Sequence, residues 1–277
     1  MTDSIHLPEI FRSRLTMVAT QTALKAGNLL KRGFGTVMTF ETKEGRHNLV
    51  TEWDKRSEAL IIETIQKHFP DHSFLAEEGG ERGAKKEGIQ WIIDPLDGTV
   101  NFAHHIPLFS VSIAATFKGE TLAGAIYCPM LEELFVGEKR NGAYLNGEEI
   151  RVTETATLDS AIIGTGFPYN THENPLHVLD LFQGFARMGI PLRRMGSAAM
   201  DLCYVAAGRF DGFWEVSLCP WDYAAAKLII EEAGGMLTNL EGLPLSALKE
   251  SPILASNGLL HDQMVKKIKK VTDDAAH

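Results

Sequence analysis

The sequence predicts an α/β protein built from two packed subdomains that meet near residue 150. Three observations support this fold class. Two segments with helical periodicity come first, a run of short strand-like segments follows them, and both kinds of segment are mixed in the second half. Strands that follow one another directly favour an antiparallel or mixed sheet over a repeated βαβ unit. The expected subdomains are residues 1–150 and residues 151–277.

In the first half, apolar residues recur at helical spacing in two segments. One helix is expected over residues 15–34, where Gly33 and Gly35 provide a stop, and a second over residues 54–69, which Pro70 ends. Two Asn-Gly pairs within residues 141–147 are typical of tight turns. Between these features, strand-like runs are expected at residues 72–77, 90–95, 109–117, 121–129 and 132–139.

The second half combines strand-like and helical segments. Strands are expected within residues 160–168 and 212–217, with a helix over residues 177–189 between them. A longer helix is expected over residues 221–235, because two glycines stand at its end. The basic segment at residues 264–271 is expected to be a solvated helix end rather than a membrane anchor.

Composition and charge limit the classes of function. The chain has 277 residues and a formal net charge of −9, which argues against nucleic acid as its primary ligand, since a general nucleic-acid binder would have a basic surface. Bound metal ions could still make an anionic substrate acceptable. No apolar run approaches the roughly 20 residues of a membrane span, and the first ten residues lack a signal-peptide pattern. The three cysteines show no CxxC spacing, so a cytoplasmic protein with reduced thiols is expected.

The segment WIIDPLDGTVNF, residues 91–102, ends an apolar run with two carboxylates. Asp94 and Asp97 can be explained as strand-end residues that cap backbone N–H groups. They can also be explained as ligands of a hard cation such as Mg²⁺, which prefers carboxylate and carbonyl oxygens. Gly98 would let the backbone approach a ligand closely, and Thr99 would add a hydroxyl where a phosphate could bind. This segment alone leaves both interpretations open.

Further acidic residues stand at the ends of predicted elements in both halves. Glu77 and Glu78 directly follow an apolar run, and Asp222 stands at the expected N-terminus of the helix over residues 221–235. Each could be structural by itself, since Asp is a common residue at helix N-termini. Acids at element ends in both halves fit a cleft between two subdomains better than a set of unrelated caps.

Three segments together resemble the inositol monophosphatase family of Mg²⁺-dependent phosphatases. They are AEE at residues 76–78, WIIDPLDGTVNF at residues 91–102 and PWDYAAAKLIIEEAGG at residues 220–235, in the order found in that family. The resemblance extends from about residue 48 to residue 235. It implies the layered αβαβα sandwich of sugar phosphatases such as fructose-1,6-bisphosphatase, and it also implies a homodimer that lithium inhibits.

The resemblance implies two or three Mg²⁺ ions and the residues that would hold them. A first ion would be bound by Glu77, Asp94 and the backbone carbonyl of Leu96. A second would be bound by Asp94, Asp97 and Asp222, and Glu77 would extend to a third, weaker site. Most of these ligands would come from residues 1–150, whereas Asp222 would come from residues 151–277.

The resemblance also decides between two adjacent glutamates and raises one lysine as a further candidate. Glu77 is preferred to Glu78 because the family's ligand is the first acid of this pair. Lys43 is a weaker candidate near the metals, since a solvated surface lysine explains it at least as well.

The resemblance also implies residues for catalysis and for substrate binding. Asp54 and Thr99, together with Glu77, correspond to residues that orient or activate the attacking water. Gly98 and Thr99 would offer backbone amides to phosphate, and Glu215 would accept a substrate hydroxyl. The expected substrate-binding set is Asp97, Gly98, Thr99, Gly196, Ser197, Ala198, Glu215 and Asp222.

The predicted reaction is therefore Mg²⁺-dependent hydrolysis of a phosphate monoester, with myo-inositol 1-phosphate as the leading substrate. Metal ions neutralise such an ester, lower the pKa of a bound water and stabilise the departing oxygen. Fructose 1,6-bisphosphate, histidinol phosphate and 3′-phosphoadenosine 5′-phosphate remain alternative substrates. A regulatory protein that acts through a partner and a structural cation-binding protein remain alternatives of other classes. Asp97→Asn is expected to separate an enzyme from a regulator.

Overall fold

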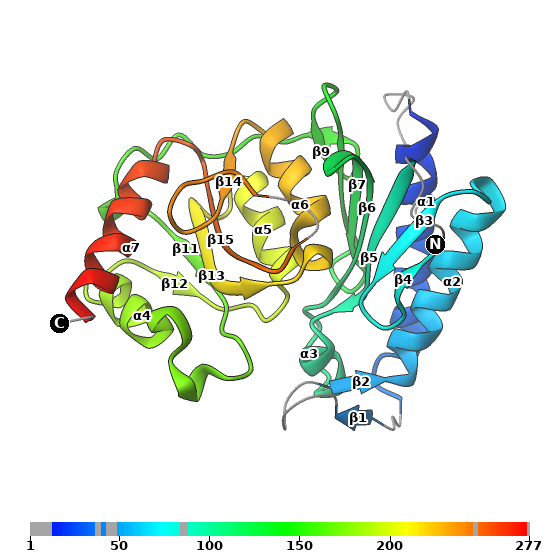
Figure 1. The fold of residues 1–277 in the computed structure, drawn as a ribbon, viewed down its shortest axis with the longest axis horizontal. Helices are drawn as coiled ribbons and strands as arrows, with labels where there is room; N and C mark the ends of the chain where they lie inside the picture. The colour runs from blue at the N-terminus through cyan, green and yellow to red at the C-terminus, as the bar shows by residue number, and fades with distance from the viewer. Residues whose placement is uncertain (1–12, 37–39, 43–48, 84–87, 246–248, 276–277) are drawn as a thin grey trace.

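The protein forms five layers that alternate between helices and sheets. The computed structural model describes residues 13–36, 40–42, 49–83, 88–245 and 249–275. From one end to the other, the layers are α1 (Arg14–Gly33) with α2 (Glu52–His68), a large sheet, α5 (Ala198–Ala206) with α6 (Pro220–Glu232), a smaller sheet, and α4 (Val178–Ala186) with α7 (His261–Ala275) (Figure 1). The predicted αβαβα sandwich is thus confirmed. Lys43 lies outside the described residues.

The first layer consists of α1 (Arg14–Gly33) and α2 (Glu52–His68), which pack against each other. α1 ends at Gly33, where Phe34 turns to an extended conformation. The ring of Trp53 lies against Gly33, so a Cβ there would stand 2.4 Å from the indole. α2 begins two residues earlier than predicted, because Thr51 and Asp54 form a capping box around its first turn. The apolar face of α1 packs mainly on β6 (Ser110–Phe117) and β7 (Glu120–Cys128) of the large sheet, and that of α2 packs on β5 (Ile89–Asp97).

The large sheet has the order β10-β9-β8-β7-β6-β5-β3-β4. Among the described residues of this sheet, β3 and β5 pair in parallel and the other neighbours are antiparallel, so of the two predicted kinds, antiparallel or mixed, the sheet is mixed. Asn146 and Gly147 both have positive φ, 51° and 91°, as the tight turn between β9 and β10 requires. The strands are β3 (Ser73–Ala76), β4 (Gly80–Arg82), β5 (Ile89–Asp97), β6 (Ser110–Phe117), β7 (Glu120–Cys128), β8 (Glu133–Glu138), β9 (Ala143–Leu145) and β10 (Glu148–Glu149). A separate two-stranded sheet joins β1 (Phe40–Thr42) to β2 (Leu49–Thr51).

The smaller sheet has the order β12-β11-β13-β15-β14. The predicted strands within residues 160–168 and 212–217 are present as β11 and β13, which pair in parallel. No pattern in the sequence predicted β14 or β15, although β15 lies inside the sheet between β13 and β14. The strands are β11 (Ile163–Thr165), β12 (Leu192–Arg193), β13 (Gly212–Leu218), β14 (Met236–Thr238) and β15 (Ser251–Ser256).

The central layer consists of α5 (Ala198–Ala206) and α6 (Pro220–Glu232), which lie between the two sheets (Figure 1). α6 approaches β7 closely, since a Cβ on Gly124 would lie 2.9 Å from the carbonyl oxygen of Ala225. One hydrophobic cluster runs through this layer and joins residues from both sides of residue 150, such as Ile126 and Ile229. The division of the chain into subdomains at residue 150 therefore stays a prediction.

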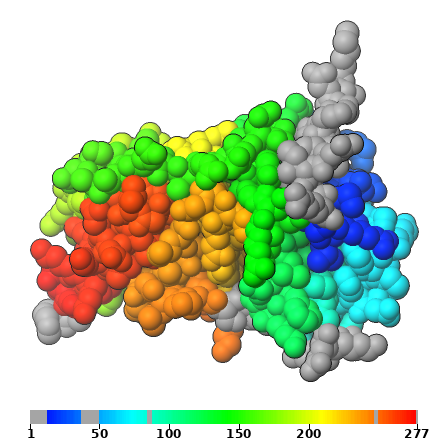
Figure 2. Space-filling model, turned by 90° about the horizontal axis from the view of Figure 1, so that it is seen from above, coloured from blue at the N-terminus to red at the C-terminus, as the bar shows by residue number. Residues whose placement is uncertain are grey.

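The fifth layer consists of α4 (Val178–Ala186) and α7 (His261–Ala275), which pack against each other. Figure 2 shows the N-terminal segments at one end of the molecule and α7 at the other. Within the described residues, every helix is too short or too polar to cross a membrane. The remaining helices are α3 (Thr99–Ala103), η1 (Leu158–Ser160), η2 (Thr171–Glu173) and η3 (Pro175–His177).

Candidate metal centre and adjoining cavity

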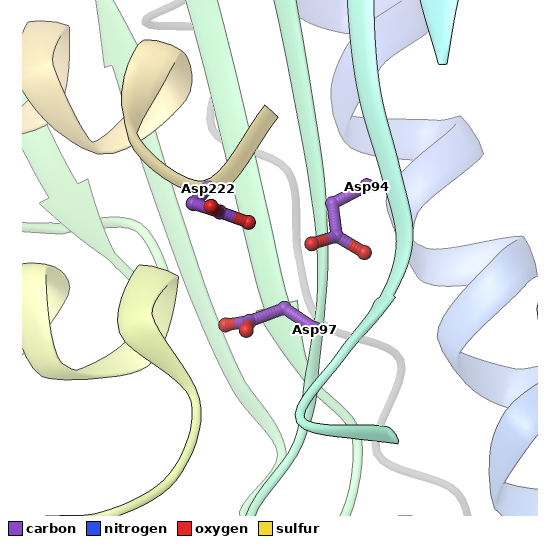
Figure 3. Close-up of side chains that lie close together, drawn as sticks. All are labelled: Asp94, Asp97 and Asp222. Atoms are coloured by element: carbon purple, nitrogen blue, oxygen red, sulfur yellow. The ribbon is translucent and has the colours of Figure 1, made fainter. Parts of the chain in front are cut away.

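Three carboxylates from distant parts of the chain meet between the large sheet and the central helices. Asp94 and Asp97 lie on β5, and Asp222 lies in the first turn of α6. One carboxylate oxygen of each residue lies within 4.8 Å of those of the other two. Figure 3 shows the three side chains close together, with Asp94 and Asp97 on one strand and Asp222 at the start of a helix. Three of the acids that the motifs singled out therefore form one cluster.

An irregularity in β5 allows two of its carboxylates to share this cluster. In a regular strand, residues three positions apart point to opposite faces of the sheet. Here Asp94 is paired with Ser112 and Asp97 with Ser110, so β5 uses one residue more than β6 over this stretch. Pro95 lies within it and has no N–H to donate to a neighbouring strand. The β-bulge therefore turns both carboxylates to the same side.

Gly98 follows the cluster in a conformation that few other residues adopt. Its φ is +90° and it precedes the short helix α3. A Cβ there would lie 3.0 Å from the carbonyl oxygen of Leu108 and 3.1 Å from that of Gly196. The chain can make this turn between two backbone segments only with glycine, which keeps Thr99 close to the carboxylates.

Asp222 also caps its own helix. It occupies the third position of α6, and the N–H of Cys219 donates to its Oδ2 at 2.7 Å. The structural and functional interpretations of this residue are compatible, because one carboxylate oxygen caps α6 while the side chain still belongs to the cluster.

Asp97 connects β5 to the N-terminus of α5. Its Oδ2 accepts hydrogen bonds from the hydroxyl of Ser197 and from the N–H of Ala199, the latter at 2.9 Å. Its Oδ1 accepts one from the N–H of Ala198 at 3.2 Å. Ser197 and Ala198, which were expected to contact substrate, thus contact a carboxylate of the cluster in this structure.

Burial makes the cluster electrostatically unfavourable on its own. The pKa of Asp94 is raised well above its ordinary value, first by burial and then by Glu77, Asp97 and Asp222. Burial also raises the pKa of Asp222, and Asp97 and Glu77 add to the effect. Neighbouring carboxylates stay ionised when positive charge compensates them. Carboxylate oxygens at this separation are a donor set suited to a hard divalent cation, so the residues fit the predicted Mg²⁺.

A cavity of about 800 Å³ adjoins the cluster. Glu77 is not part of the three-carboxylate cluster, but it lies on the wall of the same cavity. Apart from Asp54, the structure brings all the predicted ligand and substrate residues to this cavity: Glu77, Asp94, Leu96, Asp97, Gly98, Thr99, Gly196, Ser197, Ala198, Glu215 and Asp222.

Asp54 lies behind Thr99 rather than on the cavity wall. It is fully buried in the first turn of α2, where its Oδ2 accepts the N–H of Thr51 at 2.8 Å and also the Thr51 hydroxyl. The Thr99 hydroxyl lies 3.0 Å from Asp54 Oδ1 and 2.9 Å from the carbonyl oxygen of Leu96. Burial raises the pKa of Asp54 to about 6, although the bonds from Thr51 and Thr99 oppose the rise. A carboxylate that contacts the cavity through a hydroxyl can orient a polar group there.

Asp201 and Glu250 lie on the cavity wall although no sequence pattern predicted them there, and Arg194, which the sequence allowed either to bind phosphate or to form an ion pair, lies on the same wall. Asp201 is buried in α5, and within the described residues its Oδ1 has no hydrogen-bond partner. The pKa of Glu215 is raised to about 8, first by burial and then by Asp201 and Asp97, while Arg194 opposes the rise. A single acid within the apolar run AAMDLCYVA gave no signal of this location.

Comparisons with known proteins agree with the geometry. The model of the inositol monophosphatase family matches residues 12–273. The Nus factor SuhB of Escherichia coli strain K12 is 42% identical over 226 residues, which cover 81% of this chain and 85% of that protein. The inositol-1-monophosphatase of Mesorhizobium japonicum is 40% identical over 263 residues, covering 94% and 97%.

Solved structures of similar proteins superimpose on this chain over most of its length. The extragenic suppressor protein SuhB of Bartonella henselae superimposes with a TM-score of 0.87 at 37% identity, covering 93% of this chain and 99% of that one. An IMPase/NADP phosphatase complexed with Mg²⁺ and phosphate superimposes with a TM-score of 0.78 at 27% identity, covering 88% and 90%.

Proposed function

Because the chain belongs to the inositol monophosphatase family, we propose that it hydrolyses a small phosphate monoester with the help of Mg²⁺, and that myo-inositol 1-phosphate is its preferred substrate. The observation that carries this proposal is the convergence of Asp94, Asp97 and Asp222 on the wall of a cavity of about 800 Å³. Carboxylates from both halves of the chain are what a reaction with an anionic ester and divalent cations needs.

Two or three Mg²⁺ ions would be held by Glu77, Asp94, Asp97, Asp222 and the carbonyl of Leu96. Bound there, the ions would supply positive charge to the phosphate and make a nearby water more acidic. The structure similar at 27% identity that contains Mg²⁺ and phosphate supports this choice of metal. The raised pKa of Asp94 and Asp222 supports it too, since both carboxylates need compensating charge.

Asp54 and Thr99 would position the attacking water. The Thr99 hydroxyl can donate to Asp54 or to Leu96, which leaves its oxygen free to accept a hydrogen bond from a water in the cavity. Asp54 is held from behind by Thr51, so this chain of hydrogen bonds has a fixed end. The backbone amides of Gly98 and Thr99 would bind the phosphate, because both residues line the cavity at the start of α3 and backbone N–H groups can donate to phosphate oxygens.

The alcohol part of the substrate would lie toward Glu215, Asp201 and Arg194. Two buried carboxyl groups and a guanidinium can recognise several hydroxyls of a polyol, which supports inositol phosphate over a simple alkyl ester. A relative named inositol-1-monophosphatase supports the same substrate.

Phosphate release by the purified chain tests this proposal. With Mg²⁺ present we expect turnover of inositol 1-phosphate, and with a chelator we expect none. The panel should also contain fructose 1,6-bisphosphate, histidinol phosphate and 3′-phosphoadenosine 5′-phosphate. Faster turnover of one of these esters would reassign the preferred substrate. No turnover of any ester would contradict the proposal that the chain is a phosphatase.

A regulatory role through a protein partner is a second candidate, and the similarity to proteins named Nus factor SuhB favours it. Such a role can coexist with catalysis, because a partner could bind a surface away from the cavity. The third candidate, a structural cation-binding protein, predicts bound Mg²⁺ without phosphate release in the same panel.

We also propose a homodimer in the cytoplasm. Leu176, Leu179 and Phe182 place exposed apolar side chains on and just before α4, and an apolar surface of this kind suits contact with a second copy. Light scattering should give the mass of two chains, and a mass of one chain would contradict the dimer.

A further inference from the structure

Glu58 is a buried carboxylate on α2 that accepts hydrogen bonds from the segment after β3. It is 3% exposed. Its Oε2 accepts the backbone N–H groups of Glu78 at 2.9 Å and Gly79 at 3.1 Å, and its Oε1 lies 3.2 Å from Arg82 Nη2. Asp and Glu are almost never fully buried unless they are paired, so the burial of Glu58 depends on these three partners.

The segment that Glu58 holds is the one that presents Glu77. β3 ends at Ala76, and the N–H of Glu77 donates to the carbonyl of Ile93 on β5 at 3.2 Å. The next two N–H groups, of Glu78 and Gly79, have left the sheet, and Glu58 accepts both. Three consecutive backbone N–H groups are therefore bonded, one to β5 and two to Glu58. Together they fix the direction in which the backbone carries the Glu77 side chain.

The neighbouring residues on α2 act in the same direction. Ser57 is fully buried, and its hydroxyl donates to the carbonyl of Pro95 at 2.8 Å. Asp54, one turn earlier, contacts Thr99. The buried polar side chains of α2 thus bind two backbone segments, the end of β5 and the segment after β3. These two segments carry the candidate metal ligands Asp94, Asp97 and Glu77.

From these contacts we infer that Glu58 is a positioning residue, which sets the divalent-cation affinity of the candidate metal centre by fixing the backbone that carries Glu77. The inference rests on the proposed function, in which Glu77 binds metal. Glu58 acts through the position of its oxygen and not through its charge, because its direct partners next to Glu77 are two uncharged N–H groups. Partners that orient a metal ligand typically change metal affinity by about 10–100-fold when they are removed.

Two substitutions separate position from charge. Glu58→Gln keeps an oxygen at the same reach and loses the charge, so we expect its Mn²⁺ affinity to stay within about threefold of the unsubstituted chain. Glu58→Asp keeps the charge but is one methylene shorter, so the two N–H groups lose their acceptor and we expect Mn²⁺ to bind about 10–100-fold more weakly. Both variants keep a polar group in the buried site, which favours folding.

Two control variants complete the series. Arg82→Ala removes the cation that pairs with Glu58 while it leaves the acceptor for Glu78 and Gly79 in place. Its side chain is 51% exposed, so little change in Mn²⁺ affinity is expected. Glu63→Gln changes an exposed glutamate on the same helix, and it should bind Mn²⁺ like the unsubstituted chain.

Direct titration with Mn²⁺ alone, followed by calorimetry and electron paramagnetic resonance, provides the readout, and circular dichroism checks the fold. Weak binding by Glu58→Asp with near-normal binding by Glu58→Gln supports the inference. The reverse order would show that charge matters, and equal affinities in all variants would show that Glu58 has no positioning role; either result overturns it. Because no substrate is present, the titration is independent of hydrolysis. A chain that binds Mn²⁺ but releases no phosphate would refute the proposed function, and Glu58 would still be judged on the same affinities.

Discussion

Asp94→Asn is expected to lower kcat/KM for phosphate release by on the order of 10³ or more, because metal ions supply several kcal/mol of transition-state stabilisation. The asparagine carbonyl can still accept the N–H of Leu96, which lies 3.0 Å from Asp94 Oδ1. The local turn should therefore persist while the negative charge is lost. A phosphate-release assay over a range of Mg²⁺ concentrations measures the effect.

The same substitution should change stability in the opposite direction. Asp94 is buried beside Glu77, Asp97 and Asp222, and these neighbours and burial disfavour its charged form. Without metal, Asp94→Asn is expected to raise the melting temperature of the chain, and added Mg²⁺ should stabilise the variant less than the unsubstituted protein. Asp159→Asn, which changes an exposed aspartate, serves as the control. Retention of Mg²⁺-dependent activity, or a lower melting temperature in chelator, would contradict the assigned role.

Asp94 also separates enzyme from regulator better than Asp97, the residue suggested by the sequence. The Asp97 carboxylate accepts hydrogen bonds from Ser197, Ala198 and Ala199, so Asp97→Asn would place an amide against N–H donors and disturb α5. A phenotype of Asp97→Asn could then reflect a changed surface. Loss of partner binding in Asp94→Asn, by contrast, would link that binding to the metal.

Asp54→Asn is expected to lower kcat by about 10²–10⁴, the usual effect of removing a group that assists proton transfer. Both Asp54 oxygens act as acceptors, one for Thr51 and the other within reach of the Thr99 hydroxyl. An amide can replace only one of them, so its NH₂ group would face a donor. Steady-state kinetics with saturating Mg²⁺ should show the loss in kcat, and a variant with near-normal kcat would contradict the role.

The pH dependence gives a second test of Asp54. Its pKa is raised to about 6, chiefly by burial, and only the deprotonated carboxylate has both oxygens available as acceptors, Oδ2 for Thr51 and Oδ1 for the Thr99 hydroxyl. The rate of the unsubstituted protein should therefore rise with pH as pH passes through about 6, and Asp54→Asn should lack this rise. Asp262→Asn, an exposed aspartate in the first turn of α7, should keep the normal profile.

The sequence predicted α1 and α2 from their helical periodicity and β3 and β5 to β8 of the large sheet from their apolar runs, whereas β4, β9 and β10 were not expected as strands. α1 and α2 each bury one face, and β5 to β8 are long apolar runs bounded by turns. α5 was missed because it lies between two sheets and is buried on several sides, from Ala199 and Met200 to Val205 and Ala206. A helix without a polar face gives no helical period. β14 is only three residues long. β15 is a short run, SPILAS, with a proline at its second position, and proline within a run is a signal against a strand.

For the site, motif order identified the carboxylates, but their supporting contacts were not visible in the sequence. Asp94 and Asp97 stand out because they interrupt an apolar run. Ser57 and Glu58 stand within DKRSEALI, where polar residues look like the solvated side of a helix, yet both are buried. Their partners, Pro95 and the segment after Ala76, are 20 or more residues away, and no local pattern encodes such pairs.

The bond network around Asp97 has a consequence for chimeric proteins. Its oxygens accept hydrogen bonds from residues about 100 positions further along the chain. The position of this carboxylate therefore depends on how the end of β5 and the start of α5 fit together. A graft of residues 151–277 from a distant homologue would bring its own donors to this carboxylate. Recombination breakpoints that keep residues 97 and 197–199 from the same parent should give folded hybrids more often than those that split them.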